Sequence, residues 1–449
     1  MVARWILAAC CAAAAFGAEP AHQAFPYSYQ QEDLPNGLRL ITVPTDYPNL
    51  AAVYIVVRTG SRNEVEPGHT GFAHLFEHLM FKGTEKYPAA QYNALLQQLG
   101  ASSNAYTTDD YTCFHTTFSK EDLRTVLAME ADRFQNLKYT EPEFKTEALA
   151  VLGEYNKNSS NPSGKLGEVV ADTAFDTHTY KHTTMGFLKD IQDMPNQYAY
   201  SLQFFDRYYR PEYTTIIVVG DVKPKAVRAA VDKYWGDWKR GSFHAEIPQE
   251  RPQQAPRTGH VAWPADTLPL LKISFKVPAY TDSAKDTAAL DAIAFLAFSP
   301  SSDLYQKLVI RERKADQLFA RNPQSLDPSL FSITARVKQP EDMDYVRGQI
   351  LDTIRQFRDR PVDAARLNAV RDHLRYSFAL AMDSSDAIAA ILAPYVALRR
   401  SPEMINKFFD ELAALTPDDV RQAASRYLTD NGSTIVTLTG PRAEAGGSR

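Results

Sequence analysis

Cysteine is scarce in this chain, with three in 449 residues. Cys10 and Cys11 lie near the start, so removal of the first 18 residues would leave Cys113 alone. A single cysteine cannot form an internal disulfide, and the fold then depends on its apolar core even in an oxidising compartment. With 44% apolar and 23% charged residues, the chain can build ordinary cores, and its length favours two domains.

Long apolar runs are also missing. The stretch from Trp5 to Phe16 follows Arg4 and precedes two small residues, but it is shorter than the ~20 residues that a spanning helix needs. No later stretch reaches that length. The order of charge, apolar stretch and small residues predicts a secretory signal over 1–18. We therefore expect an exported, periplasmic and soluble protein without a transmembrane segment.

A lipoprotein anchor is the less favoured alternative for the same segment. Leu7 to Cys10 resembles a lipoprotein cleavage box, but the apolar core that it leaves after Arg4 is shorter than the roughly 7 to 15 residues that are usual.

A strong charge of one sign is absent as well. The net charge is -5 with both signs interspersed, whereas nucleic-acid binding needs clustered Lys and Arg. Nucleic acid is therefore not expected as a partner.

The chain carries an internal repeat with an offset of about 220 residues. Residues 207–220 and 426–440 each combine a helix end, a turn and a strand that closes on glycine. Residues 51–57 and 271–277 are similar strands at the same offset. Two generic strand-after-helix units are the alternative, but the agreement of the two offsets favours a duplication.

Helices and hairpins are mixed along each half. Residues 34–38 place an Asn-Gly turn between two runs in which apolar and polar residues alternate. This pattern predicts a β-hairpin. A strand is expected over 50–58, and residues 242–259 hold three prolines without helical or strand periodicity, so they predict a linker. This mixture favours the α+β class over a doubly wound parallel sheet.

The candidate chemistry begins at residues 70–81. Thr70 suits a helix cap, and apolar residues recur at helical spacing after it. His74 and His78 are then one turn apart on one face, so both imidazoles can reach one zinc ion, with Glu77 beside them to activate water. This is the H-x-x-E-H pattern of zinc peptidases. The alternative interpretation is a surface helix whose histidines are neighbours without binding a metal.

A catalytic zinc needs a third protein ligand, and a carboxylate is a common one. Glu147 and Glu154 lie two turns apart on a helix predicted from about 142 to 158, so both can face the histidine helix. Spacing alone does not say which of them is the ligand. Other acids in the region serve equally well as solvated charges, namely Glu141, Glu143 and Glu168.

Together these residues resemble the pitrilysin and insulysin metallopeptidases, the inverzincins. The resemblance depends on residues 74–84, Glu147 with Glu154, residues 101–107 and residues 131–133. The similarity covers nearly the whole mature chain. The pattern is most similar to the mitochondrial-processing-peptidase-like branch and its bacterial members. The resemblance implies two similar α+β halves, each an α/β roll with a mainly antiparallel sheet, that close like a clamshell.

The resemblance also assigns roles. It implies that Glu154 is the third ligand of one Zn²⁺ per chain and that Glu147 supports the site. The substrate would lie in extended form along an edge strand with Asn104, Ala105 and Thr107. Residues 294–300, which correspond to the metal motif in the second half, contain no His or Glu.

One departure from the family concerns an Arg and a Tyr, seven residues apart, that bind substrate in many members. Arg311 is the candidate arginine here, but Leu318 stands at the tyrosine position. Arg311 and Arg313 fit a solvated helix face equally well. His115, His178 and His182 are expected to be ordinary histidines.

The sequence therefore predicts a zinc metalloendopeptidase in which Glu77 is the general base for hydrolysis of peptides or unfolded proteins. The alternatives are a noncatalytic or weakly active partner subunit and a peptide-binding factor. A homodimer or a heterodimer with a related subunit fits the resemblance. The predicted domains are a signal peptide over 1–18, a catalytic zinc-binding domain over 19–241, a linker over 242–259, a second domain without metal over 260–441 and a flexible tail over 442–449.

Overall fold

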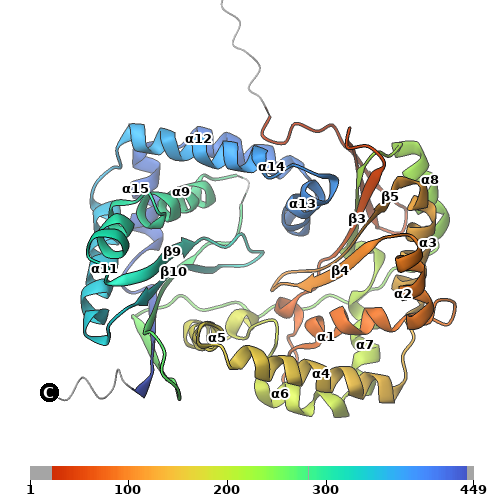
Figure 1. The fold of residues 1–449 in the computed structure, drawn as a ribbon, viewed down its shortest axis with the longest axis horizontal. Helices are drawn as coiled ribbons and strands as arrows, with labels where there is room; N and C mark the ends of the chain where they lie inside the picture. The colour runs from red at the N-terminus through yellow and green to blue at the C-terminus, as the bar shows by residue number, and fades with distance from the viewer. Residues whose placement is uncertain (1–22, 282, 442–449) are drawn as a thin grey trace, which may run out of the picture.

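The structure is a computed structural model that describes residues 23–281 and 283–441. The predicted signal segment and tail lie outside these residues. The chain forms two halves that face each other, each with one sheet and helices packed on it (Figure 1). Each half has its own apolar core. Within the described ranges, no helix is both long and apolar enough to cross a membrane.

The first half contains a six-stranded sheet in the order β1-β2-β6-β3-β5-β4. Its strands are β1 Gln30–Asp33, β2 Arg39–Pro44, β3 Leu50–Val57, β4 Ser102–Thr107, β5 Thr112–Ser119 and β6 Thr214–Gly220. The predicted hairpin is confirmed, because β1 and β2 pair antiparallel. Gly37 has a φ of 88° in the turn, a conformation that favours glycine. The central strands β3 and β6 are apolar and almost entirely buried, because the sheet is covered on both faces.

The second half repeats this sheet without a counterpart of β1, in the order β7-β11-β8-β10-β9. Its strands are β7 Arg257–Ala262, β8 Leu270–Val277, β9 Ala315–Arg321, β10 Ser329–Val337 and β11 Ser433–Thr439. In both sheets one pair is parallel, β2 with β6 and β7 with β11, and the other pairs are antiparallel. The α+β class and the duplication are therefore confirmed.

Helices surround both sheets. In the first half they are α1 Phe72–Leu79, α2 Ala89–Gln98, α3 Leu123–Asn136, α4 Glu141–Ser159, α5 Pro162–Ala174, α6 Leu188–Asp193, α7 Tyr198–Tyr208 and α8 Pro224–Trp235. In the second half they are α9 Asp286–Phe298, α10 Asp303–Tyr305, α11 Met343–Asp359, α12 Ala364–Leu380, α13 Ser385–Arg399, α14 Glu403–Ala413 and α15 Pro417–Tyr427. A π-helical turn, Gln306–Arg311, continues α10.

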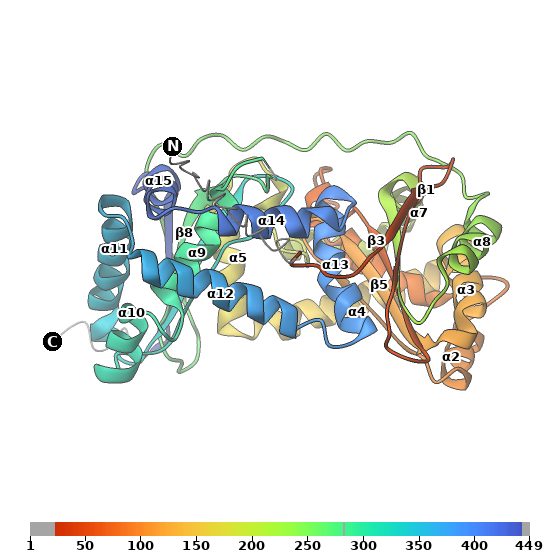
Figure 2. The ribbon, with the colours of Figure 1, turned by 90° about the horizontal axis from the view of Figure 1, so that it is seen from above.

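The connection between the halves is a long extended segment that crosses the molecule after α8 (Figure 2). The expectation that residues 242–259 form no strand is wrong at one end, because β7 begins at Arg257. The polar residues there gave no strand signal, and the strand forms because β11 offers it a partner.

Each half also contributes a helix to the sheet of the other half. Ile388, Leu392 and Val396 of α13 share an apolar cluster with Val43 and Ile217 of the first sheet. These three positions of α13 recur every four residues, so they form one apolar stripe.

In the reciprocal contact, Leu166 and Val170 of α5 pack with Leu270 and Val436 of the second sheet. The halves are therefore joined by two exchanged helices as well as by the connecting segment.

Candidate metal centre

Helix α1 carries the H-x-x-E-H motif and is anchored by its apolar face. Phe72, Leu75, Phe76 and Leu79 are fully buried in the core of the first half. Their spacing leaves the motif residues on the remaining face, toward α4 and β4.

The start of α1 is capped by an acid that the sequence did not indicate. Glu64 accepts hydrogen bonds from the amides of Gly71 and Ala73, at 2.8 and 2.7 Å. The expected cap, Thr70, instead donates to Asp190 at 2.7 Å, so this expectation is wrong. Burial raises the pKa of Glu64 to about 8, although the two amide donors act in the opposite direction. A loop separates Glu64 from the helix, so no local spacing rule could have identified it.

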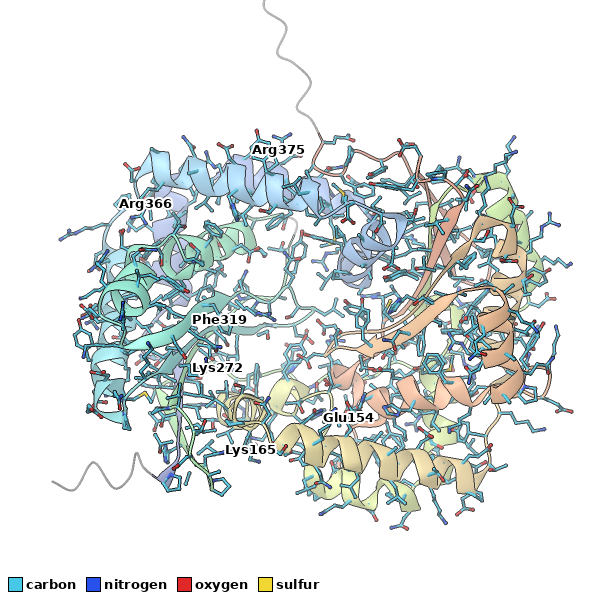
Figure 3. All side chains as sticks on the ribbon, viewed as in Figure 1. Glu154, Lys165, Lys272, Phe319, Arg366 and Arg375 are labelled. Atoms are coloured by element: carbon cyan, nitrogen blue, oxygen red, sulfur yellow. The ribbon has the colours of Figure 1, made fainter. Side chains whose placement is uncertain are left out.

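Two imidazoles and one carboxylate converge between α1 and α4. Glu154 Oε2 lies 3.6 Å from His74 Nε2 and 3.5 Å from His78 Nε2. The ligand atoms of these three residues all lie within 4.8 Å of one another. Figure 3 labels Glu154 on α4, which runs beside α1.

This geometry fits zinc. Donor atoms that share a tetrahedral zinc at bonds of ~2.0–2.1 Å lie ~3.3 Å apart. Burial and the neighbouring His78 lower the pKa of His74 to about 4, which keeps its imidazole neutral, the form that binds a metal. Two nitrogens and one carboxylate oxygen also form a donor set typical of catalytic zinc.

Glu147 occupies a different place from Glu154. Its Oε2 lies 3.4 Å from His78 Nδ1, the nitrogen on the far side of the ring from the cluster. Its Oε1 lies 2.5 Å from Lys82 Nζ, a partner that no sequence signal indicated. The hydrogen bond with His78 and the contact with Lys82 outweigh burial and lower the pKa of Glu147 to about 2. A carboxylate in this position orients the imidazole and fixes its tautomer.

Glu77 is held beside the cluster by the edge strand. Thr107 Oγ1 of β4 donates to Glu77 Oε2 at 2.8 Å. Burial raises the pKa of Glu77, although the bond from Thr107 opposes this. A raised pKa makes the carboxylate a stronger base.

The residues expected to bind substrate are divided between two places. Asn104, Ala105 and Thr107 all lie on β4, the outermost strand of the first sheet and the one that contacts Glu77. Arg311 lies in the second half at the end of the π-helical turn, where it is exposed and lines a hollow with Asp303. The structure does not bring Arg311 into the cluster, and its role stays a prediction.

His115, His178 and His182 lie outside this cluster. His115 stacks on Tyr54 with ring centroids 4.9 Å apart. His178 Nε2 lies 3.0 Å from Asp327 Oδ2, and His182 Nδ1 lies 3.0 Å from the carbonyl oxygen of Thr183.

Comparison with known families matches most of the chain. A family model described as "Insulinase (Peptidase family M16)" matches residues 39–187. A second model, "Peptidase M16 inactive domain", matches residues 198–374.

Individual relatives agree with these matches. "Zinc protease PqqE" of Helicobacter pylori is 29% identical over 429 residues, which cover 94% of this chain and 95% of the relative. "Probable mitochondrial-processing peptidase subunit beta, mitochondrial" of Arabidopsis thaliana is 26% identical over 426 residues. These residues cover 90% of this chain and 77% of the relative. A crystal structure of a protease from Helicobacter pylori superposes with a TM-score of 0.86 at 28% identity, covering 92% of this chain and 99% of that chain.

Proposed function

The chain belongs to peptidase family M16, the insulinase family of zinc proteases, and from this premise we propose that it is a metalloendopeptidase that hydrolyses peptides or unfolded polypeptides. The observation that carries the proposal is the convergence of His74, His78 and Glu154 on one point, with Glu77 beside them.

In this proposal, His74, His78 and Glu154 hold one zinc ion per chain. Zinc bound there would act as a Lewis acid that acidifies water and polarises the scissile carbonyl. Glu147 keeps His78 in the tautomer that presents Nε2, because its carboxylate accepts a hydrogen bond from Nδ1–H.

Glu77 is the proposed general base. Its carboxylate takes a proton from the attacking water and delivers it to the nitrogen of the leaving amine. Thr107 donates to Glu77 from its side chain and its backbone, which supports this role by holding the carboxylate beside the cluster.

Strand β4 is the proposed substrate platform. It is the outermost strand of its sheet, so an extended peptide can pair with its backbone at Asn104, Ala105 and Thr107. Backbone pairing depends on the extended shape of a peptide more than on its side chains, so we expect broad specificity. The contact between Thr107 and Glu77 places the platform next to the proposed base.

The test compares the mature wild type with Glu77→Gln for zinc content and for cleavage of an unstructured quenched peptide. We expect about one zinc in both proteins and cleavage only by the wild type. Zinc in both without cleavage in either would favour a noncatalytic partner subunit or a peptide-binding factor. Equal cleavage by both would contradict the role of Glu77, and the absence of zinc from both would contradict the metal centre.

Export to the periplasm and assembly with a second subunit are separate proposals. The first is supported by the charge and apolar pattern of residues 1–18, and peptide sequencing of the mature N-terminus tests it. The second is supported by a relative named as a subunit, and light scattering of the purified protein distinguishes a monomer from a homodimer.

A further inference from the structure

The internal duplication gives the metal centre a counterpart in the second half. Helix α1 packs against the edge strand β4, and helix α9 packs against the edge strand β9 in the same way. Where the first half has metal ligands, the second half has a hollow of about 830 Å³. Eight of its 20 lining residues are aromatic, among them Phe295, Phe298, Phe319, Phe378 and Tyr395. This volume and lining are typical of a binding pocket for an organic group.

Two carboxylates line the hollow, and they differ in that Asp316 is already paired with Arg336 at 2.7 Å. Asp291 of α9 lines the hollow and accepts a hydrogen bond from Asn322 Nδ2 at 2.9 Å. Burial raises its pKa to about 7. Among residues 23–281 and 283–441, no ion pair joins Asp291 to a basic side chain, and no positive charge contributes to its pKa shift. A buried carboxylate without a cation is costly when it is ionised.

Asp291 has amide donors in Asn322 and Gln324, whereas a second acceptor in the same wall has no donor among the described residues. Asn322 uses its amide nitrogen on Asp291, and its carbonyl oxygen Oδ1 is buried without a hydrogen-bond partner in the described part of the chain. The pocket therefore presents a carboxylate and an amide oxygen close together, with aromatic rings around them. A cationic group satisfies both acceptors, and aromatic faces add a favourable interaction with its charge.

The pocket opens beside a strand that can pair with a peptide. Figure 3 labels Phe319, which is exposed on β9. Beyond β9 the chain reaches the first half, where Leu326 N donates to Asp110 Oδ2 at 2.9 Å, next to the β4–β5 turn. In Figure 1, β4 and β9 lie on the sides of the two halves that face each other.

We propose that this pocket is a specificity subsite for a lysine or arginine side chain of the peptide substrate, with Asp291 and Asn322 as the residues that recognise its charge. The inference rests on the proposed peptidase function for the identity of the ligand as a peptide. It goes beyond that function because it assigns a binding role to the half of the chain without metal ligands.

The test measures binding, so that it does not depend on cleavage. The zinc-loaded full-length mature chain with Glu77→Gln is titrated with acetylated, unstructured fluorescent peptides that carry arginine at one of several positions, or citrulline at the same position. Acetylation removes the N-terminal ammonium as a competing cation. We expect the best arginine peptide to bind at least about tenfold more tightly than its citrulline partner.

Asp291→Asn in this background should abolish the preference for arginine and leave binding of the citrulline peptide unchanged. Asp316→Asn is the matched control, because Asp316 lines the same hollow but is already paired with Arg336 at 2.7 Å. It should keep the preference. Ala294→Phe, which fills the hollow without changing charge, should also abolish the preference and provides the test if Asp291→Asn does not fold.

Several outcomes would overturn the inference: equal binding of arginine and citrulline peptides, a preference that survives in Asp291→Asn, or equal loss in Asp291→Asn and Asp316→Asn. Failure of the proposed function is a separate result, because it is detected as missing cleavage by the wild type with any peptide.

Discussion

At the scale of single residues, two acids on one helix have different surroundings. Glu147 and Glu154 are two turns apart on α4, and their spacing alone could not rank them as ligands. The structure places Glu154 against both Nε2 atoms and Glu147 against Nδ1 of His78. The difference arises from the angle at which α4 crosses α1, which is a tertiary property that spacing along one helix does not contain.

This difference predicts unequal effects on zinc binding. Glu147→Gln should weaken zinc by roughly 10- to 100-fold, as expected for a residue that orients a ligand. Glu154→Gln should weaken zinc by more than that, because it removes a donor charge from the cluster. Competition with a chelator of known affinity measures both values. Glu141→Gln, an exposed position on the same helix, is the control, and a larger effect of Glu147→Gln would reverse the assignment.

At the scale of secondary structure, sequence signals predicted the elements that are stabilised by residues nearby in the chain. The predicted helix over about 142–158 corresponds to α4, whose start is fixed by a Thr140–Glu143 capping box, and the β1–β2 hairpin follows from its Asn-Gly turn. The cap of α1 and the strand β7 were missed because their partners, Glu64 and β11, come from distant parts of the chain. The packing of α5 and α13 could not be predicted for the same reason. An apolar stripe indicates that a helix is covered, but it does not indicate which sheet covers it.

The cap of α1 is itself testable. Glu64→Ala removes the acceptor for two helix amides and should lower the free energy of unfolding by about 1–2 kcal/mol. Zinc affinity should fall with it, because α1 carries both histidines. Chemical denaturation and zinc titration measure the two effects. Glu85→Ala, at an exposed position after α1, should change neither, and unchanged zinc affinity in Glu64→Ala would show that the cap does not support the site.

At the scale of the whole molecule, the exchange of α5 and α13 should hold the halves together without the connecting segment. A protease site inserted after the exposed Glu246 allows the segment to be cut in the folded protein. We expect the two fragments to elute together in gel filtration and to keep their zinc, because each sheet still packs on a helix of the other half. The uncut protein is the control, and separate elution of the fragments would contradict this account.

A polar contact between the halves should depend on pH. Asp327 Oδ2 of the second half lies 2.5 Å from Arg62 Nε and 3.0 Å from His178 Nε2 of the first half. Burial alone would raise the pKa of Asp327, but the bonds from His178 and Arg62 lower it to about 2. The contact therefore stabilises the folded protein above the unfolded pKa of about 3.9 and is lost as the pH falls toward 2.

Asp327→Asn tests this dependence. The variant should be less stable than the wild type at pH 7, and the difference between their denaturation midpoints should shrink between pH 4 and pH 3. A difference that stays constant over this range would exclude the carboxylate charge as the origin of the effect.

The metal centre is the central claim, and anomalous diffraction at the zinc absorption edge tests it most directly. Crystals of the mature protein should show one peak per chain within ~2.0–2.2 Å of His74 Nε2, His78 Nε2 and a carboxylate oxygen of Glu154. A peak that these three residues do not share, or no peak in crystals supplied with zinc, would contradict the account.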